Sequence, residues 1–298
     1  MSTNEPTDKL SIGTIITKTA PFLADKKIPN PRLEADLMLA NILNQPRVKL
    51  YSEWDRLLSP VEVQQYRELI LKRVQGWPLA YLTGKKSFLS WDFKVTPAVL
   101  IPRPETELLI ETIHEAARAL TINGPVEITG IDVGTGSGVI AIALAKLLPG
   151  STWYASDISP EALQIAKENA LSLGVADRIE FMTGDLLEPF LANPVISRKF
   201  DFIVANLPYI TSAGFPLLPK EVRMEPVLAL DGGDDGLALY RRLFPQALEL
   251  LTDQGIIAVE HGYDQRPLLE EILRKLGLSS QSFKDLAGVE RVLIIQRR

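Results

Sequence analysis

The chain has 298 residues, of which 46% are hydrophobic and 23% charged, as in ordinary globular proteins. It has no cysteine, which excludes disulfides, thiolate nucleophiles and cysteine-based metal sites, and His114 and His261 lie too far apart in sequence to indicate zinc. No apolar run approaches the roughly 18 residues of a membrane span, and the polar N-terminus lacks a secretory signal. We therefore expect a cytoplasmic protein without a metal or a membrane partner.

Charge is spread unevenly along the chain. Residues 1–100 hold 14 basic and 10 acidic side chains, whereas residues 101–298 hold 18 basic and 27 acidic ones. Direct binding of nucleic acid usually needs a dense basic patch. This distribution is too mild for one, so no direct nucleic-acid partner is expected.

Residues 1–75 are predicted to form a small helical domain. Ser59-Pro60 followed by Glu62 indicates a helix start with proline in the first turn. Apolar residues recur at helical spacing in two sets: Leu37, Leu39 and Leu43, and Leu69, Leu71 and Val74. Four prolines are expected to divide the region into short helices: Pro21, Pro29, Pro31 and Pro46. The domain could dock a substrate or could be a plain structural cap, and its residues alone leave both open.

Residues 76–102 are predicted to form a hinge containing a hairpin. Short strands and a turn are indicated by Phe88, Trp91, Phe93 and Val95 together with Gly84 and Ser87.

From residue 103 to residue 298 the pattern alternates between strand and helix, which predicts an α/β fold with a parallel sheet covered on both faces. The expected strands are Val126–Val133, Thr152–Ser156, Ile179–Thr183, Phe202–Ala205, Ile256–Glu260, Ser282–Lys284 and Val292–Gln296. The expected helices are Ile140–Leu148, Pro160–Leu173, Leu237–Leu251 and Leu268–Leu276. Such sheets bind ligands at the carboxyl ends of their strands.

A glycine-rich loop ends the first of these strands and opens a helix. After Asp132 and Val133 it reads Gly134, Thr135, Gly136, Ser137 and Gly138. A dinucleotide site needs G-x-G-x-x-G, but the position of its third glycine is taken by Val139. The tighter spacing suits a ligand without a pyrophosphate, such as S-adenosylmethionine, and argues against an oxidoreductase. A purely structural turn is the alternative.

Two aspartates follow the next two strands. Asp157 is placed to accept hydrogen bonds from both ribose hydroxyls of such a cofactor. Asp157-Ile158-Ser159-Pro160 also fits a helix start, with Ser159 as the cap, and both roles are compatible. Asp185 is placed to bind the adenine amino group, although a plain loop aspartate explains it equally well.

The segment Asn206-Leu207-Pro208-Tyr209 follows the apolar strand Phe202–Ala205 directly. An amide or aromatic amino nitrogen is a poor nucleophile because its lone pair is delocalised. The Asn206 side-chain oxygen and the Leu207 carbonyl could accept both N–H groups of such a target and leave its lone pair facing a methyl donor. Tyr209 would pack on the flat face of the target. A turn alone explains Asn206 and Pro208, but not their position beside two other cofactor-end motifs.

These motifs, with five others, resemble those of the HemK/PrmC family of release-factor glutamine methyltransferases. Val99–Glu107 resembles the signature of the family, and within it Ile101–Glu107 is highly specific; Pro78–Gly84 resembles the hinge motif of the family. Later motifs are Glu225-Pro226, Asp231–Leu237, and Glu260-His261-Gly262 with Gln265.

The resemblance implies a seven-stranded Rossmann-like class I methyltransferase domain at 103–298, after a small helical domain and a β-hairpin linker. It also implies S-adenosylmethionine-dependent methylation of the glutamine in the Gly-Gly-Gln loop of class 1 peptide release factors. Residues 134–138, Asp157, Leu186 and Asn206 would meet the cofactor. Residues 206–209 would hold the glutamine.

The chain departs from the family at Leu207, where proline is usual, and at Leu186, where an aromatic is frequent. A contact through the Leu207 carbonyl survives the exchange but the loop is less stiff, and Leu186 still offers the adenine an apolar surface. Asn-Leu-Pro-Tyr also resembles ribosomal RNA adenine N6-methyltransferases, the alternative enzyme class. The Ile101–Glu107 segment, the lack of a basic patch and the position of the extra domain argue against it. A non-catalytic binding module is disfavoured by the intact glycine loop and Asn206.

Overall fold

The computed structural model describes residues 10–121, 127–193 and 199–298. The chain divides into two compact units. One comprises Met1–Gly84 with Lys220–Met224, and the other comprises Lys85–Pro219 with Glu225–Arg298. The division of the chain into a docking domain, a hinge and a catalytic domain, with boundaries near residues 75 and 102, stays a prediction.

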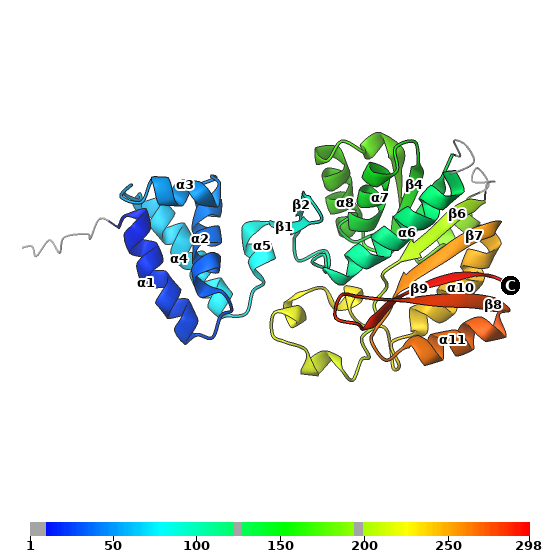
Figure 1. Ribbon diagram of the computed structural model, residues 1–298. Coiled ribbons are helices and arrows are strands. Elements are labelled where there is room, and N and C mark those ends of the chain that lie inside the picture. The colour runs from blue at the N-terminus through cyan, green and yellow to red at the C-terminus, as the bar shows by residue number, and fades with distance from the viewer. Residues whose placement is uncertain (1–9, 122–126, 194–198) are drawn as a thin grey trace, which may run out of the picture. The chain divides into compact units, whose positions relative to one another are not determined.

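The N-terminal unit is helical. Its helices are α1 (Ile12–Asp25), α2 (Pro31–Ile42), α3 (Arg47–Ser52), α4 (Pro60–Val74) and α5 (Leu79–Thr83) (Figure 1). The predicted start of α4 is confirmed, because Ser59 and Glu62 form a reciprocal capping box: the Ser59 hydroxyl accepts the Glu62 N–H, and the Glu62 carboxylate accepts the Ser59 N–H. The core of this unit includes Ile12, Ile16, Leu39 and Tyr66.

One proline does not divide the helices as expected. Pro31 is the first residue of α2 and Pro46 caps α3, but Pro21 lies inside α1. A proline in a helix removes one backbone hydrogen bond. The helix continues because residues on both sides of Pro21, including Ile16 and Leu23, are buried in the core of the unit.

A buried arginine holds the segment Lys220–Met224 in the N-terminal unit. The Arg73 side chain is 1% exposed and forms two hydrogen bonds to the carboxylate of Glu34, as well as an ion pair of 2.8 Å with Glu221. A buried charge is stable only when it is paired. Glu221 therefore anchors Lys220–Met224 to the helices.

The larger unit is built on a seven-stranded sheet. The hairpin β1 (Lys85–Phe88) and β2 (Trp91–Lys94) precedes it. The strands of the sheet are β3 (Thr129–Val133), β4 (Thr152–Asp157), β5 (Ile179–Thr183), β6 (Phe200–Ala205), β7 (Leu251–Glu260), β8 (Leu278–Lys284) and β9 (Glu290–Arg297). Their order is β5-β4-β3-β6-β7-β9-β8, and β9 runs antiparallel to both of its neighbours. The expected α/β fold is confirmed, but the sheet is mostly rather than wholly parallel, because β9 is antiparallel to its neighbours.

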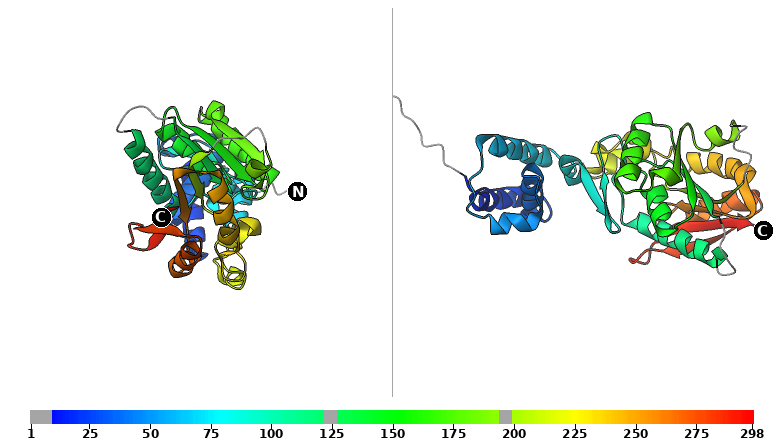
Figure 2. Two further views of the ribbon diagram at one scale, coloured as in Figure 1. Left: turned by 90° about the vertical axis from the view of Figure 1, so that its right-hand side faces the viewer. Right: turned by 90° about the horizontal axis from the view of Figure 1, so that it is seen from above.

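Helices cover both faces of this sheet (Figure 1, Figure 2). They are α6 (Glu105–Thr121), α7 (Val139–Leu147), α8 (Pro160–Ser172), α9 (Glu188–Leu191), α10 (Ala238–Leu250) and α11 (Arg266–Lys275). The side chains of α6 and α7 share a core with Phe202 and Val204, whereas those of α10 and α11 share one with Ile203 and Ala205. Successive residues of β6 thus enter opposite cores, as strand geometry requires.

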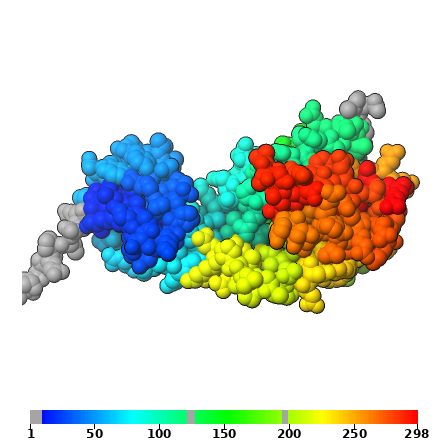
Figure 3. Space-filling model, turned by 60° about the horizontal axis from the view of Figure 1, so that its bottom comes forward, coloured from blue at the N-terminus to red at the C-terminus, as the bar shows by residue number. Residues whose placement is uncertain are grey.

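Short 3-10 turns complete the chain: η1 (Ala176–Arg178), η2 (Phe215–Leu217), η3 (Val222–Met224) and η4 (Val227–Ala229). Figure 3 shows in yellow that the stretch around η2 and η4 lies on the surface, where Leu217 and Leu228 are more than half exposed. The expected strands and helices are all present; the strand Ile179–Thr183 has the expected bounds, and the ends of the others are shifted. The strand expected from Val126 begins at Thr129, and Val126 itself lies outside the described residues.

Candidate active site

The glycine loop joins β3 to α7 at the carboxyl edge of the sheet. Gly134, Gly136 and Gly138 all have positive φ (71°, 55° and 82°), a conformation that other residues rarely adopt. The N–H groups of Gly134 and Thr135 both donate to the carbonyl of Ser156 in β4, at 2.8 and 2.9 Å, which fixes the turn. A side chain on Gly136 would point into open space, so this glycine leaves its backbone accessible to a ligand.

A buried aspartate holds the loop from beneath. Asp132 is fully buried, and its Oδ2 accepts the Thr135 hydroxyl at 2.6 Å and the Ala141 N–H at 3.1 Å. Its Oδ1 has no hydrogen-bond partner in the described part of the chain. Burial raises the pKa of Asp132 to about 7. The sequence predicted the loop but no role for Asp132, since nothing local shows that this carboxylate points inward.

Asp157 ends β4 and faces the glycine loop. Its Oδ2 accepts the Gly136 N–H at 2.9 Å, and its Oδ1 accepts the Ser159 N–H at 2.9 Å. Burial raises the pKa of Asp157. The cap of α8 is Ser159, whose hydroxyl accepts the Ala162 N–H. The cap is therefore a separate residue, and the Asp157 carboxylate keeps lone pairs available for a ligand.

The loop after β5 brings an aspartate and a leucine to the same edge. Asp185 forms an ion pair of 2.6 Å with Arg242, which is a partner that the sequence did not indicate. Leu186 is buried, has φ of +50°, and accepts the Ser156 hydroxyl through its carbonyl at 2.9 Å. This bond ties the loop to β4.

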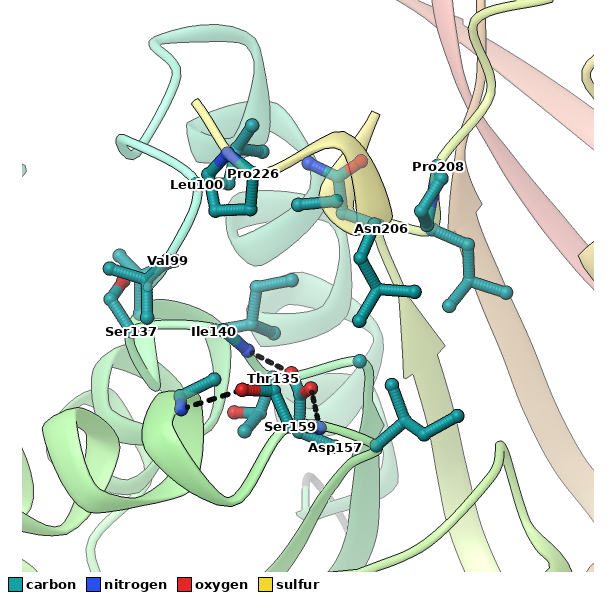
Figure 4. Close-up of a pocket in the computed structure, with 18 of the residues that line it drawn as sticks. Val99, Leu100, Thr135, Ser137, Ile140, Asp157, Ser159, Asn206, Pro208 and Pro226 are labelled. Carbon is teal, nitrogen blue, oxygen red and sulfur yellow. Dashed lines mark hydrogen bonds between the residues drawn. The ribbon is translucent and has the colours of Figure 1, made fainter. Parts of the chain in front are cut away.

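These residues line one cavity of about 520 Å³, within the range of small-molecule sites. Its lining includes the predicted Gly134, Thr135, Gly136, Ser137, Asp157, Asp185, Leu186, Asn206, Leu207 and Pro208. In Figure 4, Asp157 and Ser159 lie at one end of the cavity, whereas Asn206 and Pro208 lie at the other. Further walls come from Val99, Leu100 and Pro226, which the sequence did not connect with the cofactor.

Two predicted residues lie outside this lining. Gly138 caps α7, where an added side chain would meet Ile142 at 2.8 Å, so its role in the structure is close packing. Tyr209 packs against the second core, and its carbonyl accepts the Gln265 side-chain amide at 2.8 Å. The ligand contacts assigned to Gly138 and Tyr209 stay predictions.

The segment 206–209 presents one amide and one carbonyl. The Asn206 Nδ2 donates to the hydroxyl of Thr106 at 3.1 Å. The Leu207 side chain is 3% exposed and packs beside Gly134. The Leu207 carbonyl lies 3.4 Å from the hydroxyl of Tyr240, which also donates to the carbonyl of Glu260. A carbonyl oxygen has two lone pairs, so the Leu207 carbonyl can accept one further hydrogen bond beside that of Tyr240.

Later motifs brace this segment from behind. The Gly232 N–H donates to the Ile210 carbonyl at 2.8 Å. A side chain on Gly236 would lie 2.2 Å from the Tyr209 carbonyl, so only glycine fits there. Gln265 accepts the Gly262 N–H at 2.8 Å while it donates to Tyr209. The sequence motifs 231–237 and 260–265 therefore build a rigid support for residues 206–209.

Another motif closes the cavity wall. The buried Glu225 accepts the Ile101 N–H at 3.0 Å and forms an ion pair of 2.5 Å with Arg103. This contact joins the Val99–Glu107 segment to Pro226, although 122 residues separate Arg103 from Glu225.

Comparison with known proteins agrees with this geometry. A family model for a methyltransferase domain matches residues 126–288, and one for the PrmC N-terminal domain matches residues 14–84. Together with the seven-stranded sheet and the glycine loop, the first match defines a class I methyltransferase.

The particular family follows from the relatives. A protein of Moorella thermoacetica is 43% identical over 93% of this chain and 95% of its own length, and one of Chlorobaculum tepidum is 37% identical over 97% and 98%. Both are named release factor glutamine methyltransferase. The chain belongs to the release factor glutamine methyltransferase family, and the resemblance seen in the sequence motifs is confirmed.

Solved structures support the fold. The hMettl16 catalytic domain in complex with an RNA hairpin is 17% identical, with a TM-score of 0.55 over 82% of this chain and 85% of that one. A methyltransferase of Pyrococcus furiosus is 17% identical, with a TM-score of 0.50 over 77% and 95%. In the described ranges of the chain, no helix has both the length and the apolar character needed to span a membrane.

Proposed function

We propose that this protein transfers a methyl group from S-adenosylmethionine to the side-chain nitrogen of the glutamine in the Gly-Gly-Gln motif of class 1 peptide release factors. The relatives that share most of its length are named for this modification. The observation that carries the proposal is an oriented asparagine amide, beside the Leu207 carbonyl, at one end of a cavity whose other end holds Asp157.

The residues at the Asp157 end fit the donor. The Asp157 carboxylate has accepting capacity beyond its bonds to the Gly136 and Ser159 N–H groups, which suits the ribose hydroxyls. Leu186 and Ile158 offer apolar walls, and the absence of a side chain on Gly136 leaves open space beside the loop. Asp185 would accept a bond from the adenine amino group on the side not paired with Arg242. When bound, S-adenosylmethionine supplies an electrophilic methyl group.

The residues at the other end fit a primary amide. The Asn206 Oδ1 and the Leu207 carbonyl would each accept one of its two N–H groups. With both hydrogens held in the amide plane, the nitrogen lone pair faces out of that plane, in the orientation that methylation requires. The amide nitrogen would form a bond to the methyl carbon as the bond between that carbon and the donor sulfur breaks, the demethylated donor would leave with the electron pair on sulfur, and one N–H proton would be released. Pro208 stiffens the loop, and Tyr209 would pack against the target.

Selection of one glutamine among many requires a wider surface. A glutamine side chain is too small to distinguish its own protein, so remote contacts must select the substrate. The helical N-terminal domain, with the hairpin region as a hinge, is the proposed docking element for the release factor. The proposed setting is the cytoplasm, without a membrane or a direct nucleic-acid partner.

The test presents labelled S-adenosylmethionine with release factor and with ribosomal RNA in separate reactions. We expect label only on the release factor, at the Gly-Gly-Gln glutamine. Asn206→Ala should lower kcat at least about a hundredfold, while calorimetry shows that the cofactor still binds. Label on ribosomal RNA alone would replace this proposal with the adenine methyltransferase alternative.

A further inference from the structure

A buried hydrogen-bond chain runs behind Asn206. The Asn206 Nδ2 donates to the Thr106 Oγ1 at 3.1 Å, and that hydroxyl donates to the Glu260 Oε2 at 2.7 Å. Thr106 lies in the first turn of α6 and Glu260 at the end of β7, and they are only 2% and 1% exposed. Both residues belong to sequence motifs for which the proposed chemistry has no role.

The protons that are available determine which group donates in each of these two hydrogen bonds. An ionised carboxylate only accepts hydrogen bonds, so the Thr106 hydroxyl must donate its single proton to Glu260. Thr106 can then only accept from Asn206, which must therefore present its NH2 group. The Asn206 Oδ1 accepts no hydrogen bond from any residue that the structure describes, and Asn206 lines the cavity.

We propose that Thr106 and Glu260 are positioning residues, which lock the Asn206 amide so that its oxygen, and not its nitrogen, meets the substrate amide. The inference rests on the proposed function, because it assigns the substrate an N–H donor. A flipped Asn206 would place a donor opposite a donor and lose the contact that orients the target nitrogen. The specific Val99–Glu107 motif thus acts on the reaction through Thr106.

The orientation of the Asn206 amide depends on the charge of Glu260. Burial raises the pKa of Glu260 to about 7; hydrogen bonds from Thr106 and Asn206 and the nearby Arg291 oppose the rise, and Glu105 adds to it. Its negative charge also raises the pKa of Tyr209 and Tyr240, after burial itself. A protonated Glu260 can donate to Thr106, which frees the Thr106 proton for Asn206 and lets the amide flip. The fixed orientation of the Asn206 amide therefore requires the ionised carboxylate of Glu260.

The first experiment needs no substrate. Nuclear magnetic resonance on 15N-labelled protein measures solvent exchange of the Asn206 side-chain protons. Thr106→Val keeps the shape but removes the hydroxyl, and we expect at least about tenfold faster exchange, with Thr106→Ser close to wild type. Thr112→Val is the matched control, because Thr112 lies in the same helix and its hydroxyl donates to the Leu108 carbonyl at 2.7 Å. Equal exchange in wild type and Thr106→Val would overturn the proposal.

The second experiment measures kinetics on release factor. Thr106→Val should lower kcat about tenfold to a hundredfold with little change in KM or in cofactor affinity, because docking and the Asp157 end are untouched. Thr106→Ser should recover most of the loss. In wild type, kcat should rise as pH passes about 7, and Glu260→Gln should remove this rise. Equal losses in Thr106→Val and Thr106→Ser would refute positioning by the hydroxyl. An inactive wild-type enzyme would instead refute the proposed function, and the exchange measurement would still decide the positioning.

Discussion

The carboxylate of Asp157 is the most direct test of the cofactor site. In Asp157→Ala, the two backbone donors Gly136 and Ser159 lose their acceptor, and a bound nucleoside loses the acceptor for its two hydroxyls. Hydrogen bonds to charged groups contribute about 1.5–3 kcal/mol each. In the variant, water makes some of the hydrogen bonds that the carboxylate made. We therefore expect the free energy of cofactor binding to weaken by about 1.5–3 kcal/mol, which corresponds to a tenfold to hundredfold higher Kd.

Isothermal titration calorimetry with S-adenosylmethionine and with its demethylated product measures this loss. Asp157→Asn keeps one carbonyl acceptor, so its affinity should fall less than that of Asp157→Ala. Ser159→Ala is the control for the capping role, because Ser159 bonds the Ala162 N–H and its removal should cost about 1 kcal/mol of stability. That variant should lose thermal stability more than affinity.

The result that would refute this reasoning is an Asp157→Ala protein with wild-type affinity and a lower unfolding temperature. Asp157 would then serve only to hold the loops around Gly136 and Ser159.

Three further predictions concern other parts of the molecule. Leu207→Pro should retain activity because the carbonyl is kept, but should lower the free energy of unfolding by about 1–3 kcal/mol through lost packing; an activity loss of several orders of magnitude would assign the leucine side chain a role in catalysis. Glu260 has a folded-state pKa of about 7 against a reference of 4.5, so its contribution to stability should be lost as pH rises through this window; denaturant titrations should show about 3 kcal/mol less pH dependence in Glu260→Gln. Deleting residues 1–75 should leave cofactor binding nearly intact, which also verifies folding, and sharply reduce methylation of intact release factor but not of a Gly-Gly-Gln peptide. A folded truncation with the full rate on intact release factor would contradict the docking role.

Local patterns in the sequence predicted most elements of the fold. The strand Ile179–Thr183 has the bounds expected for it, and the capping box at Ser59 forms as the spacing indicates. Such features depend on residues a few positions apart, so the sequence displays them directly. One long helix was not predicted: α6 spans Glu105–Thr121 and starts inside the Val99–Glu107 motif, which was interpreted as a family signature and not as a helix start.

The sequence also determined which residues meet at the carboxyl edge of the sheet. The glycine loop, Asp157 and Asn206 each follow a strand, and parallel strands end at one edge. Only the tertiary structure decided their partners. Arg242 pairs with Asp185 across 57 positions, and Thr106 meets Glu260 across 154. These pairs depend on the strand order β5-β4-β3-β6-β7-β9-β8, which brings distant segments together. No short-range pattern encodes that order, because it results from burying both faces of the whole sheet at once.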